Sequence, residues 1–173
     1  MRRACLLLMV SLAATPVAAA DSAPARLRAF LDAHGNQSGL PQGRDVAAIR
    51  RFSSHALETA MDDAKEHQIR FIAANPDEKP PFIEGPLFNS SGYEPFTAYA
   101  LVLPDGGCGA DRCTIRVDFV DTAASPDVLW HDDFVMVREP RRGWVLDDVH
   151  YRAGFAYGNH GSLRANLAAA GDD

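Results

Sequence analysis

Long hydrophobic runs, an excess of basic charge and a full set of metal-binding cysteines are all missing from this sequence. No apolar stretch approaches the roughly 20 residues that a membrane-spanning helix needs. The chain carries 17 Lys and Arg against 23 Asp and Glu, so it lacks the clustered basic surface that contacts nucleic-acid phosphates, and the same acidity disfavours electrostatic docking onto anionic lipid. Its 3 cysteines are fewer than the four ligands of a structural zinc site. We therefore predict no membrane span, no nucleic-acid partner and no metal site.

The sequence motifs that mark many enzymes are also absent. It contains no G-x-S-x-G, no H-E-x-x-H, no P-loop and no dinucleotide fingerprint. These absences weaken the case for an enzyme without excluding one, because pocket residues can be scattered along a chain. We predict no cofactor, and we place a binding protein ahead of an enzyme.

The first twenty residues have the layout of a secretory signal peptide. Arg2 and Arg3 precede an apolar run at positions 5–10, and small residues close the segment at Ala20, which is the order of charge, apolar core and cleavage site in export signals. We predict cleavage after Ala20 and a single domain at positions 21–173, located in the periplasm or outside the cell. Because Cys5 precedes most of the apolar run, we do not expect a lipidated cysteine after cleavage. Removing two arginines and no acid changes the formal charge from −6 to −8.

Two cysteines remain after cleavage, Cys108 and Cys113, and four residues of a Gly-rich stretch separate them. In an oxidising compartment, two cysteines that flank a turn favour a disulfide. A redox-active pair, a metal site or free thiols are the alternatives. A disulfide across so short a loop would stabilise the fold by about 2 kcal/mol in the chain-entropy model, and its role would be to hold the loop.

Apolar residues recur at helical spacing through the first half of the chain. The spacing predicts a short helix at 24–34 and a second helix that opens at Asp45 as its N-cap. After a break at Ser53 and Ser54, a third helical pattern continues to Asn75. The charged residues of this third pattern are expected on a solvated helix face.

Prolines and glycines interrupt the middle of the sequence. Five prolines occur between positions 76 and 95, which excludes long regular structure there. We expect at most a short edge strand at 82–84 and one helical turn at 87–91.

Beyond this segment the apolar period changes from helical to alternating. Strands are predicted at 96–103, 113–121, 129–138 and 144–151, and the connections between them are too short for crossover helices. The four strands should therefore form an antiparallel meander. Ser162 is placed to cap a final short helix.

Several segments resemble an uncharacterised bacterial family of small exported proteins that is known only as a domain of unknown function. The resemblance lies in positions 77–85, 87–88, 143–151 and 161–164, and the element order resembles the nuclear transport factor two-like superfamily. It implies an α+β, cone-shaped fold in which N-terminal helices pack on a curved antiparallel sheet of four to five strands, with a short C-terminal helix. In that superfamily the concave face leaves a pocket, which members use for catalysis with Asp and His, for binding or for dimerisation, so a homodimer is also implied.

The richest polar cluster is expected on the last two strands, on either side of a hairpin about Arg141 and Arg142. That turn would pair Asp132 with His150, Phe134 with Asp148 and Met136 with Leu146. The candidate catalytic residues would then share a face with candidate ligand-binding residues; the former are Asp132, Asp148 and His150, and the latter are Phe134, Met136, Trp144 and Leu146. A shift of one residue on one strand would send these side chains to the other face.

Three hypotheses follow for the function. The first is an exported binding protein whose concave face recognises a small apolar molecule, a peptide or a protein. The second is an acid–base enzyme, hydrolase-like or lyase-like, that uses the Asp and His cluster in an apolar cavity. The third is an envelope partner such as an immunity or assembly factor. Two alternatives stand for the cluster itself: a site that holds a divalent cation by oxygen and nitrogen ligands, and a set of solvated strand ends or cross-strand pairs.

Overall fold

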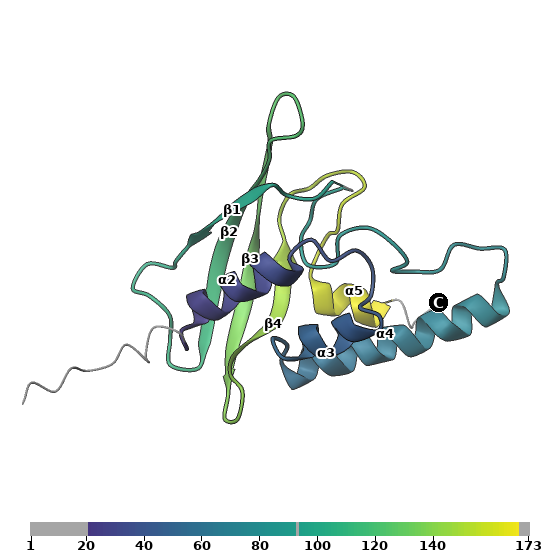
Figure 1. Ribbon diagram of the computed structural model, residues 1–173, viewed down its shortest axis with the longest axis horizontal. Helices are drawn as coiled ribbons and strands as arrows, with labels where there is room; N and C mark the ends of the chain where they lie inside the picture. The colour runs from purple at the N-terminus through teal and green to yellow at the C-terminus, as the bar shows by residue number, and fades with distance from the viewer. Residues whose placement is uncertain (1–20, 93, 170–173) are drawn as a thin grey trace, which may run out of the picture.

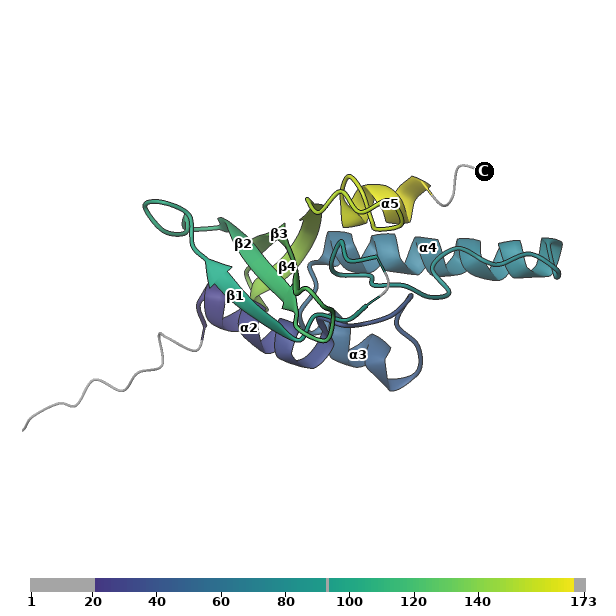
Figure 2. The ribbon, with the colours of Figure 1, turned by 90° about the horizontal axis from the view of Figure 1, so that it is seen from above.

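A computed structural model describes residues 21–92 and 94–169. The predicted signal peptide, with its cleavage site at Ala20, lies outside the described residues. The elements follow one another in the order α2 (Ala23–His34), α3 (Arg44–Arg50), α4 (His55–Ala74), β1 (Ala98–Val102), β2 (Arg112–Asp121), β3 (Val128–Glu139), β4 (Gly143–Tyr151) and α5 (Leu163–Ala169). Helix α2 lies across the sheet, whereas α4 and α5 lie together beside β4 (Figures 1 and 2). The fold is α+β, as predicted.

Serine side chains begin the two longer helices of the N-terminal half. Ser22 accepts a hydrogen bond from the backbone N–H of Ala25 at 3.3 Å, and Ser54 accepts one from Leu57 at 3.1 Å. Such caps satisfy backbone donors that the first helical turn leaves unpaired. The prediction that Asp45 caps the second helix is wrong. Helix α3 begins at Arg44, and Gly43, at φ +54, occupies the cap, because that left-handed backbone strongly favours glycine.

The sheet is the predicted meander, with strand order β1-β2-β3-β4 and every neighbouring pair antiparallel. One face of β2 carries Ile115, Val117 and Phe119, each at most 1% exposed, while Thr114 and Arg116 on the other face are exposed. We call the buried side the inner face and the opposite side the outer face. Helix α2 packs on the inner face through the apolar stripe that contains Leu27, Phe30 and Leu31.

The segment between α4 and β1 is irregular, as predicted, but neither of its expected short elements forms within the described part of the chain. Positions 82–84 contain no strand and positions 87–91 no helical turn. The loop is instead fixed by single contacts: the Leu40 N–H donates to the Phe82 carbonyl at 3.1 Å, and Ser38 forms an isolated bridge with Pro86. Phe82 adopts φ +53, a conformation that non-glycine residues rarely take.

The predicted disulfide is present between Cys108 and Cys113, whose Cα atoms lie 4.7 Å apart. It closes the loop between β1 and β2. Cys113 itself is buried at the start of β2, so the bond ties the exposed loop to the edge of the core.

Candidate functional site

The predicted pairing of β3 with β4 holds near the hairpin and fails further along. Met136 faces Leu146 as expected, but Asp132 faces Tyr151 rather than His150, and Phe134 faces Val149 rather than Asp148. The cause is a β-bulge: one step on β3, from Val135 to Met136, corresponds to two steps on β4. Asp147 is the extra residue. Every later side chain on β4 therefore lies on the face of the sheet opposite to the one that the sequence predicted.

The bulge separates the candidate catalytic residues. Asp132 stays on the inner face, whereas Asp148 and His150 pair with Val135 and Asp133 and therefore face outward. The His150 Nε2 lies 3.9 Å from the Asp148 Oδ2, with the imidazole side chain 38% exposed. The structure thus brings Asp148 and His150 together and leaves Asp132 on the other side of the sheet.

Asp132 is fully buried and is held by three hydrogen bonds. Its carboxylate accepts from the backbone N–H of Ser90 at 2.8 Å, from the Ser90 hydroxyl and from the backbone N–H of Arg152 at 2.8 Å. Burial raises the pKa of Asp132 to about 6, although these hydrogen bonds oppose the shift. The side chain therefore ties the loop at Ser90 and the end of β4 to the middle of the sheet.

Asp147 and Asp148 connect β4 to two helices. Asp147 Oδ1 accepts from the Ser54 hydroxyl at 2.7 Å and Oδ2 accepts from Arg164 Nη1 at 3.2 Å. Asp148 Oδ1 accepts from the backbone N–H of Arg164 at 3.0 Å, in the first turn of α5. The bulge thus points neighbouring carboxylates at the starts of α4 and α5. Within the described ranges, no three His, Cys, Asp or Glu side chains are grouped so as to hold a metal ion.

The four predicted ligand-binding side chains all lie in the hydrophobic core. Phe134, Met136 and Leu146 are at most 1% exposed and Trp144 is 7% exposed. The helices cover the middle of the inner face, so these residues hold the fold together where the sequence suggested a pocket wall.

A cavity opens instead at the end of the inner face where β2 ends and β3 begins. It has a volume of about 340 Å³ and we call it the Trp130 cavity. Its lining is mostly apolar, with two acids, and includes Ala124, Val128, Trp130 and Phe155 together with Glu94 and Asp121. Volumes of roughly 300–1,000 Å³ are usual for small-molecule sites, so the Trp130 cavity has the size of a small one.

Aromatic packing positions Trp130 in this cavity. Its ring stacks on Phe119, with centroids 5.5 Å apart and an interplanar angle of 22°, and meets the edge of Phe155 at 6.0 Å. Trp130 is 7% exposed, and its Nε1–H is buried with no acceptor among the described residues. An unpaired buried donor lowers the stability of the folded state by about 1–3 kcal/mol. An acceptor brought to the indole N–H would recover part of that free energy.

A second cavity of about 230 Å³ adjoins the first, and both are lined by Ser91, Gly92 and Tyr157. Its walls are held in place by side-chain bonds to the irregular loop: the Tyr151 hydroxyl donates to the Leu87 carbonyl at 2.6 Å, and Asn159 Nδ2 donates to the Pro86 carbonyl at 2.6 Å. Tyr157, 80% exposed, lies at the boundary between the two cavities.

Sequence reasoning missed Phe155 and Tyr157 as cavity residues. The signal that could have found them is two aromatic residues in a Gly-flanked loop, between Gly154 and Gly158, directly after the last strand. The Phe155 ring contacts Trp130 at the uncovered end of the sheet, whereas Tyr157 stays largely exposed at the rim of the cavity.

Comparison with known proteins finds one distant relative of uncharacterised function. The chain is 28% identical over 129 residues to the uncharacterized lipoprotein YbjP of Escherichia coli (strain K12), an alignment that covers 74% of this chain and 67% of YbjP. No family model and no solved structure matches, so membership of the nuclear transport factor two-like superfamily stays a prediction. In the described ranges no helix is both long and apolar enough to cross a bilayer. The distant lipoprotein homologue and the disulfide together indicate an envelope protein of unknown function.

Proposed function

We propose that this envelope protein is a binding protein that holds a small, mainly apolar molecule in the Trp130 cavity. The observation that carries the proposal is the buried Nε1–H of Trp130, which has no acceptor in the described part of the chain, beside an apolar cavity large enough for a ligand. Apolar walls with few polar groups are the usual composition of small-molecule sites.

The lining defines the chemistry of the ligand. Trp130, Phe155 and Val128 offer apolar surface suited to a flat or aliphatic body. The indole N–H calls for one acceptor on the ligand, such as a carbonyl, hydroxyl or ether oxygen. Glu94 and Asp121, which also line the cavity, disfavour an anion, because like charges repel in a partly desolvated site. A neutral molecule with a single oxygen acceptor meets all three conditions.

The acid–base hypothesis receives no such support. Its three residues lie on opposite faces of the sheet, and Asp132 is already engaged by Ser90 and Arg152. We therefore carry forward the binding hypothesis alone, with the inner-face site moved from the centre of the sheet to its end.

The test is a titration with 6-propionyl-2-(dimethylamino)naphthalene, a neutral apolar fluorophore whose ketone supplies one carbonyl oxygen as acceptor, monitored by its own emission and by quenching of tryptophan. The chain has 2 tryptophans, so a Trp144→Phe background leaves Trp130 as the reporter. Val128→Phe adds a ring to the wall of the cavity and should weaken binding about tenfold or more by filling its volume.

The matched control is Leu129→Phe. It enlarges the next residue on the same strand, which is 74% exposed on the outer face, and should leave the affinity unchanged. Equal weakening by both variants, or binding that leaves Trp130 emission unaltered, would contradict the proposal.

A further inference from the structure

A group of arginines gathers far from the Trp130 cavity, where α2, α3, α4 and the β3–β4 hairpin meet. An open pocket of about 510 Å³ lies there, which we call the arginine pocket. Its lining residues are Arg26, Ala47, Arg50, Arg51, Glu58 and Arg142. Four guanidinium groups and one carboxylate thus line a single pocket in a chain whose net charge is negative.

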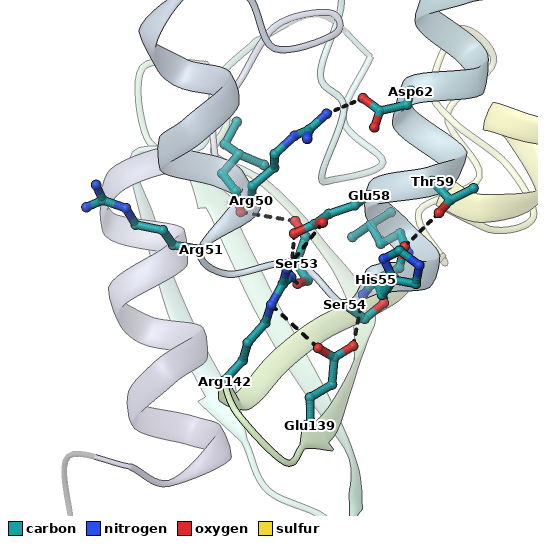
Figure 3. Close-up of polar contacts among 12 residues, drawn as sticks. Arg50, Arg51, Ser53, Ser54, His55, Glu58, Thr59, Asp62, Glu139 and Arg142 are labelled. Carbon is teal, nitrogen blue, oxygen red and sulfur yellow. Dashed lines mark hydrogen bonds and ion pairs between the residues drawn. The ribbon is translucent and has the colours of Figure 1, made fainter.

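Arg142 forms the fixed wall of the pocket. It reaches from the hairpin to Glu58 on α4 (Figure 3), where Nη1 contacts one carboxylate oxygen and Nη2 lies 3.4 Å from the other. Its Nη1 also donates to the Ser53 carbonyl at 3.1 Å. Glu58 is only 9% exposed, and Arg142 Nε also lies 3.7 Å from Glu139 Oε2, so the charge of Arg142 is taken up by these two carboxylates and is not available to a ligand.

Acidic side chains neutralise the positive charges of the remaining arginines less completely. Arg50 pairs with Asp62 at the rim, where both side chains are exposed. In Figure 3 the Arg51 guanidinium points away from Glu58, Glu139 and Asp62, and no acid pairs with it among the described residues. Its positive charge is therefore available to a ligand.

Arg26 supplies a second unused donor. Its guanidinium lies 4.3 Å from the Phe52 ring centroid and donates through Nη2 to the Arg51 carbonyl, which holds the side chain in place. Its Nε–H is buried and has no acceptor in the part of the chain that the structure describes. Arg26 stands near the N-terminal end of α2, whose first turn contains no acid, so the helix dipole adds positive potential there.

We propose that the arginine pocket binds a phosphate group. A phosphate carries several acceptor oxygens and a negative charge, which match the free Arg51 guanidinium and the unpaired Arg26 Nε–H, and arginine forks suit phosphate geometry. The phosphate could belong to a soluble phosphate ester or to a lipid headgroup, since both present the same oxygens. The site shares no residue with the Trp130 cavity, so either proposal can fail while the other stands.

The experiment is a titration of the protein with glycerol phosphate, followed by NMR of the arginine Nε–Hε pairs. Binding should shift the signal of Arg26, and Arg51→Gln should weaken the affinity about tenfold, the loss of one charge-assisted contact. Arg112→Gln removes the same charge at an exposed position on β2, outside the pocket, and should change the affinity less than about twofold because exposed charges are screened.

Two further arms identify the source of the phosphate. Sedimentation with phosphatidylglycerol vesicles that is lost in Arg51→Gln and retained in Arg112→Gln would assign the phosphate to a lipid. Binding of glycerol phosphate without sedimentation would assign it to a soluble ester. The proposal is overturned if neither probe binds, if acetate shifts Arg26 as strongly as glycerol phosphate, or if Arg112→Gln weakens binding as much as Arg51→Gln.

Discussion

The raised pKa of Asp132 makes a quantitative prediction about stability and pH. In the unfolded chain this carboxyl titrates near its ordinary value of 3.8, whereas in the folded protein its pKa is about 6. The folded state therefore binds the proton more tightly, so the contribution of this group to folding is most favourable at low pH and is lost as the pH rises through the folded value. The full shift corresponds to about 3 kcal/mol, of which about 2 kcal/mol falls between about pH 4.5 and pH 7.

Asp132→Asn isolates this contribution because asparagine has nearly the same shape and does not titrate. The amide still has an oxygen for the Ser90 hydroxyl and the Arg152 N–H, but its NH₂ would face the Ser90 N–H. We therefore expect a pH-independent cost of about 1–3 kcal/mol for the mismatched donor. Superimposed on that cost, the variant should lack the loss of stability with rising pH that the carboxyl causes.

The measurement is urea unfolding of both proteins at several pH values and constant ionic strength, followed by tryptophan fluorescence. The difference in unfolding free energy between the wild type and Asp132→Asn should shrink by about 2 kcal/mol as the pH rises over that interval. Asp63→Asn, on the exposed side of α4, removes the same charge without burial and controls for general electrostatics. A difference between wild type and Asp132→Asn that stays constant with pH would refute the reasoning.

Three other perturbations test contacts that hold the fold together. Arg142→Gln leaves the buried Glu58 carboxylate without its main partner and should cost about 2–3 kcal/mol in urea unfolding; a loss below about 0.5 kcal/mol would show that water replaces the guanidinium. Ser54→Ala removes the α4 cap together with a buried bond to a carboxylate and should cost about 1–2 kcal/mol, whereas Ser54→Asp should retain the cap and lose stability through repulsion from that carboxylate. The double variant Cys108→Ser with Cys113→Ser should lower stability by about 2 kcal/mol while far-ultraviolet circular dichroism stays unchanged, and a loss of sheet signal would mean that the loop is needed to form β2.

The strands were predictable because their side chains see two different environments. Along β2 the burial alternates residue by residue, and the sequence alternates with it. The bulge at Asp147 was not predictable in this way, because the residues around it on β4 are buried on both sides: Val145, Leu146 and Asp147 are all at most 8% exposed. Where consecutive residues are all buried, polar and apolar side chains do not alternate with the two faces of the sheet. An extra residue in such a run therefore does not change the sequence pattern.

The cavities were beyond sequence reasoning for a related reason. The Trp130 cavity forms where the end of the sheet meets two irregular loops, and the arginine pocket forms where three helices meet a hairpin. Neither site has a period or a motif. Their residues come together only through long-range packing, which Asp132 on β3 and Asp147 and Asp148 on β4 help to fix by tying loops and helices to the sheet.

The wall that the two adjoining cavities share has a thermodynamic consequence. Ser91, Gly92 and Tyr157 border both spaces. A movement of the Tyr157 ring would therefore change the volume of both cavities together. Two guests that both displace this ring would then bind with a coupling free energy that is equal in both directions, whichever guest arrives first. Two small neighbouring cavities can in this way accommodate one elongated molecule, or two short molecules whose affinities depend on each other.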